Sequence, residues 1–149
     1  MHKPLAIALT LTAGVLAATA PALAAPVDQV CGYAEVLRDS GIQSANQYME
    51  KMAGHWSDAQ REQLTVAVGA QMARFNYRDA LIYRTADIPD VAEEYFLVLR
   101  LKSTGAVYLR MFFEGNEVAE PLIEVDFKSS YYAATQAPFF QDPEPVTCP

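Results

Sequence analysis

The chain has 149 residues and a mass of 16.4 kDa, a length that fits one domain and leaves little room for a second. Its formal net charge is −7, from 11 basic and 18 acidic residues, and this balance argues against nucleic acid and anionic lipid as partners. Hydrophobic residues make up 52% of the chain, too many for a disordered protein. We therefore expect a folded domain with a hydrophobic core.

The first 24 residues have the pattern of a cleaved secretory signal peptide. Lys3 gives a basic start, residues 5–18 form an apolar run, and Ala22 and Ala24 are the small residues of a cleavage site. The apolar run is shorter than the roughly 20 residues that a spanning helix needs. We expect cleavage after Ala24, no membrane insertion of the mature protein, and a periplasmic or secreted location in a bacterium.

Two cysteines, Cys31 and Cys148, lie near the two ends of the expected mature chain. Disulfides persist in oxidising compartments, and neither cysteine belongs to a Cys-X-X-Cys redox motif. We expect a Cys31–Cys148 disulfide that tethers the Pro-rich tail, residues 137–149. Free or intermolecular cysteines are the alternative.

The beginning of the mature chain has the periodicity of two helices. The segment Val30–Arg38 places apolar residues at helical spacing, and Gly41 is free to take the positive φ that ends many helices. A second short helix is expected over Ser44–Ala53, with Gly54 at its end.

A third helix has the clearest local pattern in the chain. Ser57 followed by Gln60 matches a capping box, which predicts a helix from this point to about Arg74. The residues expected to face the core follow the three-four spacing of an amphipathic helix: Leu64, Ala67, Val68, Gln71, Met72 and Phe75.

The second half of the chain alternates apolar and polar residues with the period of β-strands. Four strands are expected: Asp79–Thr85, Tyr95–Lys102, Val107–Phe113 and Leu122–Lys128. Loops are expected at residues 86–90 and 115–121, and a hairpin turn at Gly105. In the fourth strand Ile123, Val125 and Phe127 are expected to face inward. Residues 129–135 are expected to extend this strand, and the prolines after Ala137 argue against regular structure.

These elements predict an α+β fold over residues 25–136, with N-terminal helices packed on a curved antiparallel meander of three to four strands. This order resembles the cystatin-like superfamily, particularly its nuclear-transport-factor-2-like members, over about residues 55–130. The resemblance lies in the strands Tyr95–Lys102, Val107–Phe113 and Leu122–Phe127 and the turn Ser103-Thr104-Gly105. It implies a cone whose mouth can hold a small apolar ligand. It supplies no catalytic residue, because no His/Asp or Tyr/Asp arrangement matches the enzymatic members.

Motifs for catalysis or metal binding are absent from the mature sequence. Its one histidine, His55, has Asp58 as the nearest carboxylate, and it also directly precedes Trp56, the staple residue of the capping box. One histidine and no cysteine cluster argue against a zinc-type site. We expect no catalytic residue, no metal and no cofactor. A cone-pocket enzyme acting on a small apolar substrate is the alternative, with Tyr83, Tyr95 and Asp126 as its polar pocket candidates.

Aromatic side chains exceed what one inward sheet face needs. Phe96, Tyr108 and Phe112 share the strand face opposite Leu97 and Leu109. We expect the tail residues Phe139 and Phe140 to cover this second face. A homodimer interface and a site for a ligand or protein partner are the alternatives.

Acidic residues gather in two clusters. The first contains Asp87, Asp90, Glu93 and Glu94, and the second contains Glu114, Glu117, Glu120 and Glu124. Neither has the spacing of a dedicated calcium loop. The clusters are solvated surface or they present negative charge to a basic partner.

Together these features favour an exported, non-catalytic binding module. It would act through a sheet face, a pocket or the acidic loops, on a protein partner or a small apolar ligand. The candidate partner-binding residues are Asp87, Asp90, Glu93, Glu94, Phe96, Tyr108 and Phe112. An inhibitor or immunity protein for a basic partner in the cell envelope is a further alternative.

Overall fold

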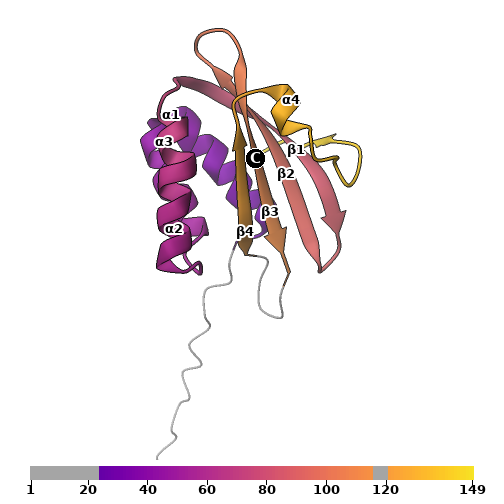
Figure 1. Cartoon of the computed structure of the whole chain (residues 1–149). Helices are drawn as coiled ribbons and strands as arrows, with labels where there is room; N and C mark the ends of the chain where they lie inside the picture. The colour runs from indigo at the N-terminus through magenta and orange to yellow at the C-terminus, as the bar shows by residue number, and fades with distance from the viewer. Residues whose placement is uncertain (1–23, 116–120) are drawn as a thin grey trace, which may run out of the picture.

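The computed structural model describes residues 24–115 and 121–149. The expected signal peptide up to residue 23, and the acidic residues Glu117 and Glu120, lie outside the described residues. The elements in chain order are α1 (Pro26–Met52), α2 (Asp58–Leu64), the π-helix η1 (Thr65–Gly69), α3 (Ala70–Met72), β1 (Tyr77–Ile88), β2 (Ala92–Leu101), β3 (Ala106–Glu114), β4 (Leu122–Lys128), α4 (Tyr131–Ala134) and β5 (Glu144–Pro145). The predicted α+β class is confirmed (Figure 1).

Helix α1 consists of two helical segments that meet at Gly41. This residue has φ 80° and ψ 180°, outside the helical region, and glycine reaches a positive φ without a Cβ clash. The expected stop at Gly41 is therefore confirmed. The second segment ends at Met52, as the expected second helix does to within a residue. The side chains that α1 buries include Val30, Tyr33, Leu37, Ala45 and Met49.

The third helix begins with the predicted capping box. The Gln60 backbone N–H donates to Ser57 Oγ over 3.4 Å, and the Ser57 N–H donates to the Gln60 side chain over 2.9 Å. The helix continues through η1 into α3 and ends at Met72. A π-helical turn contains an extra residue and rotates the helix face. Ala67 and Gln71 are consequently exposed, against expectation, and the buried residues follow a spacing of four: Leu64, Val68 and Met72.

The strands form one antiparallel sheet of five strands in the order β4-β3-β2-β1-β5. Consecutive strands from β1 to β4 pair directly, as a meander requires. The β2–β3 hairpin turns at Gly105, whose φ of 102° confirms the expected left-handed position. No helix in the described residues is long and apolar enough to cross a membrane.

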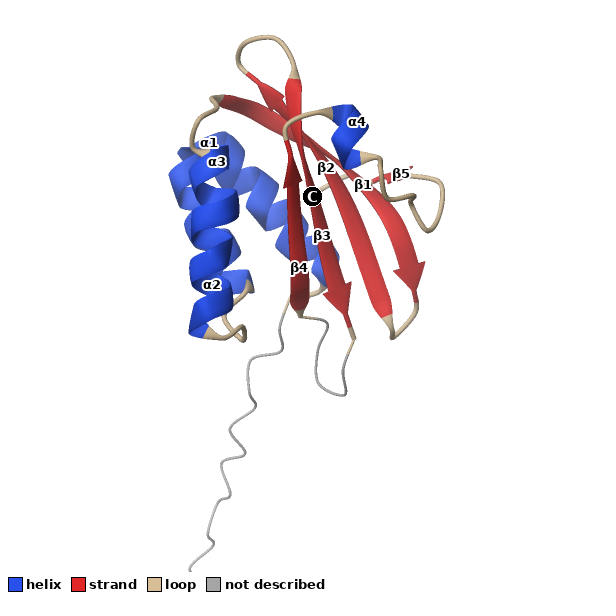
Figure 2. Ribbon diagram, viewed as in Figure 1, coloured by secondary structure: helices blue, strands red, loops and turns tan. Residues whose placement is uncertain are grey.

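The hydrophobic core lies between the helices and one face of the sheet, which we call the inner face. Figure 2 shows α1, α2 and α3 on this side of the sheet and α4 on the opposite side, the outer face. The largest buried side chains of the inner face come from β2 and β3: Tyr95, Leu97, Leu99, Leu109, Met111 and Phe113. Because both central strands contribute, the core runs across the middle of the sheet.

Strands β1 and β2 are longer than expected, because the acidic segment between them is mostly strand. Ala86, Asp87 and Ile88 pair with Glu94, Glu93 and Ala92 in turn, so the expected loop at 86–90 shrinks to residues 89–91. Asp90 occupies this turn with φ 61°. Aspartate tolerates the left-handed region better than most residues do, which suits a tight turn.

Strand β4 contains a bulge that the alternation of its sequence conceals. Phe112 pairs with Glu124 and Phe113 pairs with Leu122, so Ile123 is the extra residue. Leu122 is fully buried, whereas Ile123 is 38% exposed. The expectation that Ile123 faces inward is therefore wrong, because the bulge reverses the faces at the start of the strand.

The segment after β4 also differs from expectation. Residues 129–135 do not extend the strand; Ser130 accepts the Ala133 N–H and caps the short helix α4. The tail contains the short strand β5, in which Pro145 pairs with Tyr83 of β1. A proline is tolerated there because β5 is an edge strand. We call residues 130–148 the C-terminal strap.

The expected disulfide between Cys31 and Cys148 is confirmed, with a Cα–Cα distance of 5.6 Å. It joins α1 to the end of the C-terminal strap and closes a sequence separation of 117 residues. In the chain-entropy description, a loop of this length stabilises the folded state by up to about 5 kcal/mol.

A bidentate ion pair between β1 and β2 makes stability depend on pH. Arg100 Nε and Nη2 donate to Asp79 Oδ1 and Oδ2 over 2.6 and 2.7 Å. These hydrogen bonds hold the pKa of Asp79 below its usual value. The pair therefore stabilises the fold above the unfolded-state pKa of about 3.9, and the stabilisation is lost as pH falls through the lower folded-state pKa.

We predict that Asp79→Asn lowers the free energy of unfolding at pH 7 by less than about 1 kcal/mol, because both side chains are partly exposed. The difference from the unsubstituted protein should vanish in strong acid. Urea unfolding at the two pH values measures it. Asp142→Asn, at an exposed site, is the matched control. An equal loss at both pH values would contradict the prediction.

Candidate functional site

Cross-strand pairing places a row of side chains across the outer face. Tyr83 on β1 pairs with Phe96 on β2, Phe96 with Arg110 on β3, and Arg110 with Asp126 on β4. Directly opposed residues of antiparallel strands point to the same face. The flanking rows of this face contain Val98, Tyr108 and Lys128 on one side and Glu94, Phe112 and Glu124 on the other.

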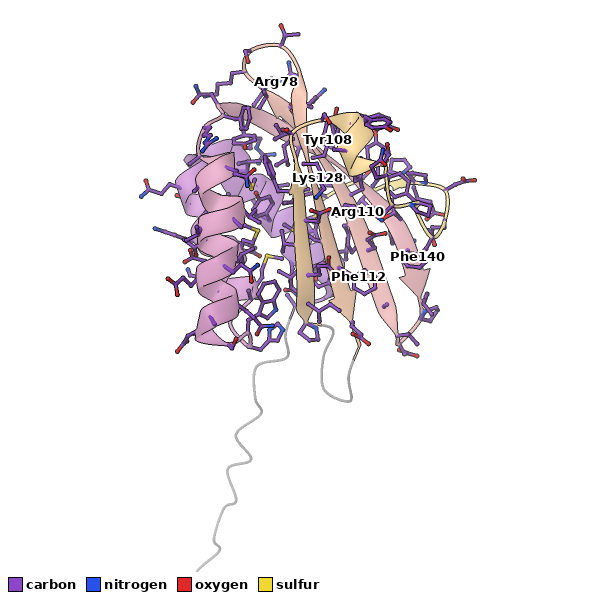
Figure 3. The ribbon with its side chains drawn as sticks, viewed as in Figure 1. Arg78, Tyr108, Arg110, Phe112, Lys128 and Phe140 are labelled. Atoms are coloured by element: carbon purple, nitrogen blue, oxygen red, sulfur yellow. A yellow bond between two sulfur atoms is a disulfide. The ribbon has the colours of Figure 1, made fainter. Side chains whose placement is uncertain are left out.

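The C-terminal strap covers the aromatic part of the outer face. Three ring pairs join strap and sheet: Phe139 with Phe96 at 5.1 Å between centroids, Tyr131 with Tyr108 at 5.7 Å, and Phe140 with Phe112 at 6.5 Å. Figure 3 shows Tyr108, Arg110 and Phe112 following one another along β3, on the side of the sheet that carries α4. The expectation that the tail covers this face is confirmed, and α4 contributes Tyr131 to the same cover.

Arg110 is the polar centre of this layer. Its guanidinium donates to Glu94 Oε1 from Nε over 2.6 Å and to the Ala137 carbonyl from Nη1 over 3.0 Å. It also lies over the ring of Phe139, 5.1 Å from the centroid. Thr85 Oγ1 donates to the second oxygen of Glu94 over 2.9 Å. The ion pair is largely desolvated, because its side chains are only 12% and 6% exposed.

A cavity of about 450 Å³ lies between the sheet and the C-terminal strap. Its walls combine aromatic rings and carboxylates: Phe112, Phe139, Phe140, Glu94, Glu124 and Asp126. Arg110 neutralises Glu94, and Lys128 donates to Asp126 over 2.7 Å. Glu124 adds a further exposed carboxylate, so the cavity is acidic on balance. Aromatic faces and carboxylates both attract cations, so this lining suits a positive group attached to an apolar body.

The three pocket candidates do not come together. Tyr83 and Asp126 share a row of the outer face, but Phe96 and Arg110 separate them. Tyr95 lies in the core on the inner face, 1% exposed, and its hydroxyl donates to Glu93. Burial, and then this hydrogen bond, raise the pKa of Tyr95, so the phenol stays protonated at neutral pH. These three residues therefore do not form the shared pocket that the alternative interpretation, a cone-pocket enzyme, requires.

The first acidic cluster divides between the two faces and the turn. Asp87 pairs with Arg84 over 2.6 Å, and Asp90 is exposed in the β1–β2 turn. Glu93 accepts the hydroxyl of Tyr95. Glu94 is 4% exposed and neutralised by Arg110, so it adds little accessible surface and no net charge to the cavity wall.

The aromatic partner-binding candidates lie under the C-terminal strap. Phe96 is 3% exposed, while Tyr108 and Phe112 are half-buried. With the strap in place, Phe96 has almost no accessible surface, and Phe112 is accessible as a wall of the cavity.

His55 and Trp56 have a structural position. The two rings pack edge to face with centroids 6.4 Å apart, and Trp56 Nε1 donates to the Leu122 carbonyl over 2.6 Å. This bond attaches the start of α2 to β4. Within residues 24–115 and 121–149, no three His, Cys, Asp or Glu side chains are grouped closely enough to hold a metal ion.

A second depression, a groove of about 600 Å³, runs between α1, the edge of β1 and the end of the C-terminal strap. Its walls include Asp28 and Glu35 of α1, Tyr83 of β1, and both disulfide cysteines. Cys31 is 8% exposed and Cys148 is half-buried. The disulfide therefore borders an open surface groove.

Comparisons with protein-family models, with curated proteins and with solved structures each find no match to this chain. The α+β class follows from the structure itself, and the function has to be argued from the geometry of the site.

We predict that Arg110→Met lowers the free energy of unfolding by about 3–5 kcal/mol, because it leaves the Glu94 carboxylate buried without a cation. Urea unfolding measures the loss. The double variant Arg110→Met with Glu94→Gln should recover part of it, since both charges are removed. Lys128→Met, which breaks an exposed pair, is the control and should cost less than about 1 kcal/mol. Equal losses in Arg110→Met and Lys128→Met would contradict the central role of Arg110.

Proposed function

We propose that the protein is an exported, non-catalytic binding module that holds a basic side chain of a protein partner in the cavity between the sheet and the C-terminal strap. One observation carries the proposal: a cavity of about 450 Å³ brings three aromatic rings together with carboxylates. The separation of Tyr83, Tyr95 and Asp126 supports the non-catalytic part of the proposal.

Arg110 illustrates, within the same layer, how such a site holds a cation. Its guanidinium lies over a phenylalanine ring and pairs with a carboxylate and a backbone carbonyl. A lysine or arginine of a partner that enters the cavity would meet the rings of Phe112 and Phe140 and the carboxylates of Glu124 and Asp126. Arginine is the better fit, since its flat cation stacks on rings and binds carboxylates in two places.

The surface around the cavity supports a protein partner over an isolated small cation. Three of the large exposed hydrophobic side chains lie on the C-terminal strap: Tyr131 at 60%, Tyr132 at 78% and Phe140 at 72% exposure. Aromatic residues are enriched at protein interfaces. The net charge of −7 attracts basic proteins over distances of about a Debye length.

Export is supported by two independent features. The disulfide is of a kind that persists in oxidising compartments, and the N-terminal sequence has the pattern of a signal peptide. We place the protein in the bacterial periplasm or outside the cell. The resemblance to the cystatin-like superfamily is likewise a proposal, supported by the order of helices followed by an antiparallel meander.

A titration with short peptides tests the binding site. The probes are two capped pentapeptides, Gly-Arg-Phe-Arg-Gly and its counterpart with glutamate in place of arginine, followed by amide chemical shifts. We predict that the arginine peptide changes the amide chemical shifts of Phe112, Glu124 and Phe140, and that added salt weakens its binding. The glutamate peptide should leave these amides unchanged.

Two variants of the cavity wall sharpen this prediction. Glu124→Gln should weaken the arginine peptide about threefold, as expected for one partly exposed ion pair. Phe140→Ala should weaken it about three- to fivefold through loss of a ring that faces the cation. Glu62→Gln, an exposed carboxylate on α2, is the matched control. Equal binding of the two peptides, or an equal effect of Glu62→Gln and Glu124→Gln, would refute the proposed site.

A further inference from the structure

The C-terminal strap has few noncovalent attachments beyond Phe140. Gln141 N–H donates to the Thr85 carbonyl over 3.1 Å, and Val146 N–H donates to the Ile82 carbonyl over 2.9 Å. The pairing of β5 with β1 covers two residues, and Arg84 of β1 forms a partly exposed ion pair with Glu144 over 3.2 Å. Prolines at 143 and 145 have no N–H to add to these bonds. The disulfide at Cys148 is therefore the strongest attachment of this end of the strap.

The disulfide is also reachable from outside. Both cysteines line the groove of about 600 Å³ between α1 and β1, and Cys148 is the more exposed of the two. Because Cys148 is the more exposed of the two residues, we take its sulfur as the point of attack for a thiolate that enters the groove. Cys31 belongs to the hydrophobic core and Cys148 packs against its edge, so the groove gives access to the disulfide from the Cys148 side.

We infer that the Cys31–Cys148 disulfide is a reducible lock on the C-terminal strap, and that a dithiol reductant opens the strap by breaking it. One thiolate of the dithiol attacks Cys148 Sγ, the S–S bond breaks, and Cys31 leaves as a thiolate that takes up a proton. The second thiol of the reductant then attacks the mixed disulfide. Two electrons pass to the protein, which ends with two thiols, and the reductant ends as a disulfide.

Opening the strap changes the cavity, because the strap supplies part of its wall. Ala137, Pro138, Phe139 and Phe140 line the cavity from the strap side, and Arg110 reaches the strap only through hydrogen bonds and one ring contact. Freeing Cys148 turns a segment fixed at both ends into a chain terminus, which frays more readily. This consequence for binding rests on the proposed function; the opening itself does not.

The test is reduction of the folded protein with dithiothreitol in the absence of denaturant. Two readouts are followed: hydrogen exchange of the Gln141 and Val146 amides, and affinity for the arginine peptide. We expect at least tenfold faster exchange at both amides after reduction and about three- to fivefold weaker peptide binding, as for Phe140→Ala. Core amides such as Leu99 and Leu109 should exchange faster only by the loss of global stability, and should remain protected while the Gln141 and Val146 amides exchange. Cys148→Ser should reproduce the reduced state without reductant, and Thr147→Ala, which keeps the disulfide, is the matched control.

The outcomes separate the two proposals. A disulfide that resists dithiothreitol until denaturant is added would overturn the lock, and so would unchanged exchange at Gln141 and Val146 or collapse of the whole fold on reduction. Cys31→Ser gives a second check, since it should match Cys148→Ser in both readouts. If the arginine peptide binds neither the oxidised nor the reduced protein while exchange at the two amides still accelerates, the disulfide lock is supported and the proposed function is refuted.

Discussion

The buried ion pair between Arg110 and Glu94 is the interaction on which the outer layer depends. A guanidinium has five N–H donors, and removing it from water is costly unless those donors find acceptors. Glu94 supplies a carboxylate from the neighbouring strand, but the side of Arg110 that faces away from the sheet has no strand above it. The Ala137 carbonyl and the ring of Phe139 fill that role. The Arg110 guanidinium thus depends on the C-terminal strap for an acceptor, and the strap in turn shields the ion pair from water.

This requirement also explains why a cavity forms beside the ion pair. The contacts with Arg110 fix Ala137 and Phe139 above β3, next to Phe112. The neighbouring strand β4 contributes Glu124 and Asp126 on the same face of the sheet. The rings and carboxylates of the cavity wall come from these three sources. The rings and carboxylates that stabilise the internal guanidinium therefore recur in the wall of the adjoining open cavity. Stability and the proposed recognition share one layer of side chains.

Local features of the fold were predictable from sequence where one residue decides the backbone, as Gly41, Gly105 and the Ser57 capping box do. The π-helical turn at 65–69 and the bulge at Ile123 were not, because each inserts one residue into a pattern whose period looks unbroken. The ion pair was missed for a different reason. Glu94 belongs to an acidic cluster just before the expected strand Tyr95–Lys102, although the alternation continues back from Phe96 and places Glu94 on the same face as Arg110. A carboxylate beside apolar strand residues was the available indication of a buried partner.

The strap has two anchors of different physical kinds, and they lie at opposite ends of its irregular segment. Arg110 holds it near Ala137 through charge, desolvation and ring contact, and the disulfide holds it at Cys148 through a covalent bond. Between them, Phe140 is 72% exposed, and residues 142–145 are all exposed. Local stability is lowest where burial is slight and hydrogen bonds are few, so the segment between the two anchors is the first part of the strap to open locally. Phe140 lies in that segment and forms the outer wall of the cavity. Phe140 can therefore shift to admit a partner's side chain, while Arg110 holds Ala137 and Phe139 in position.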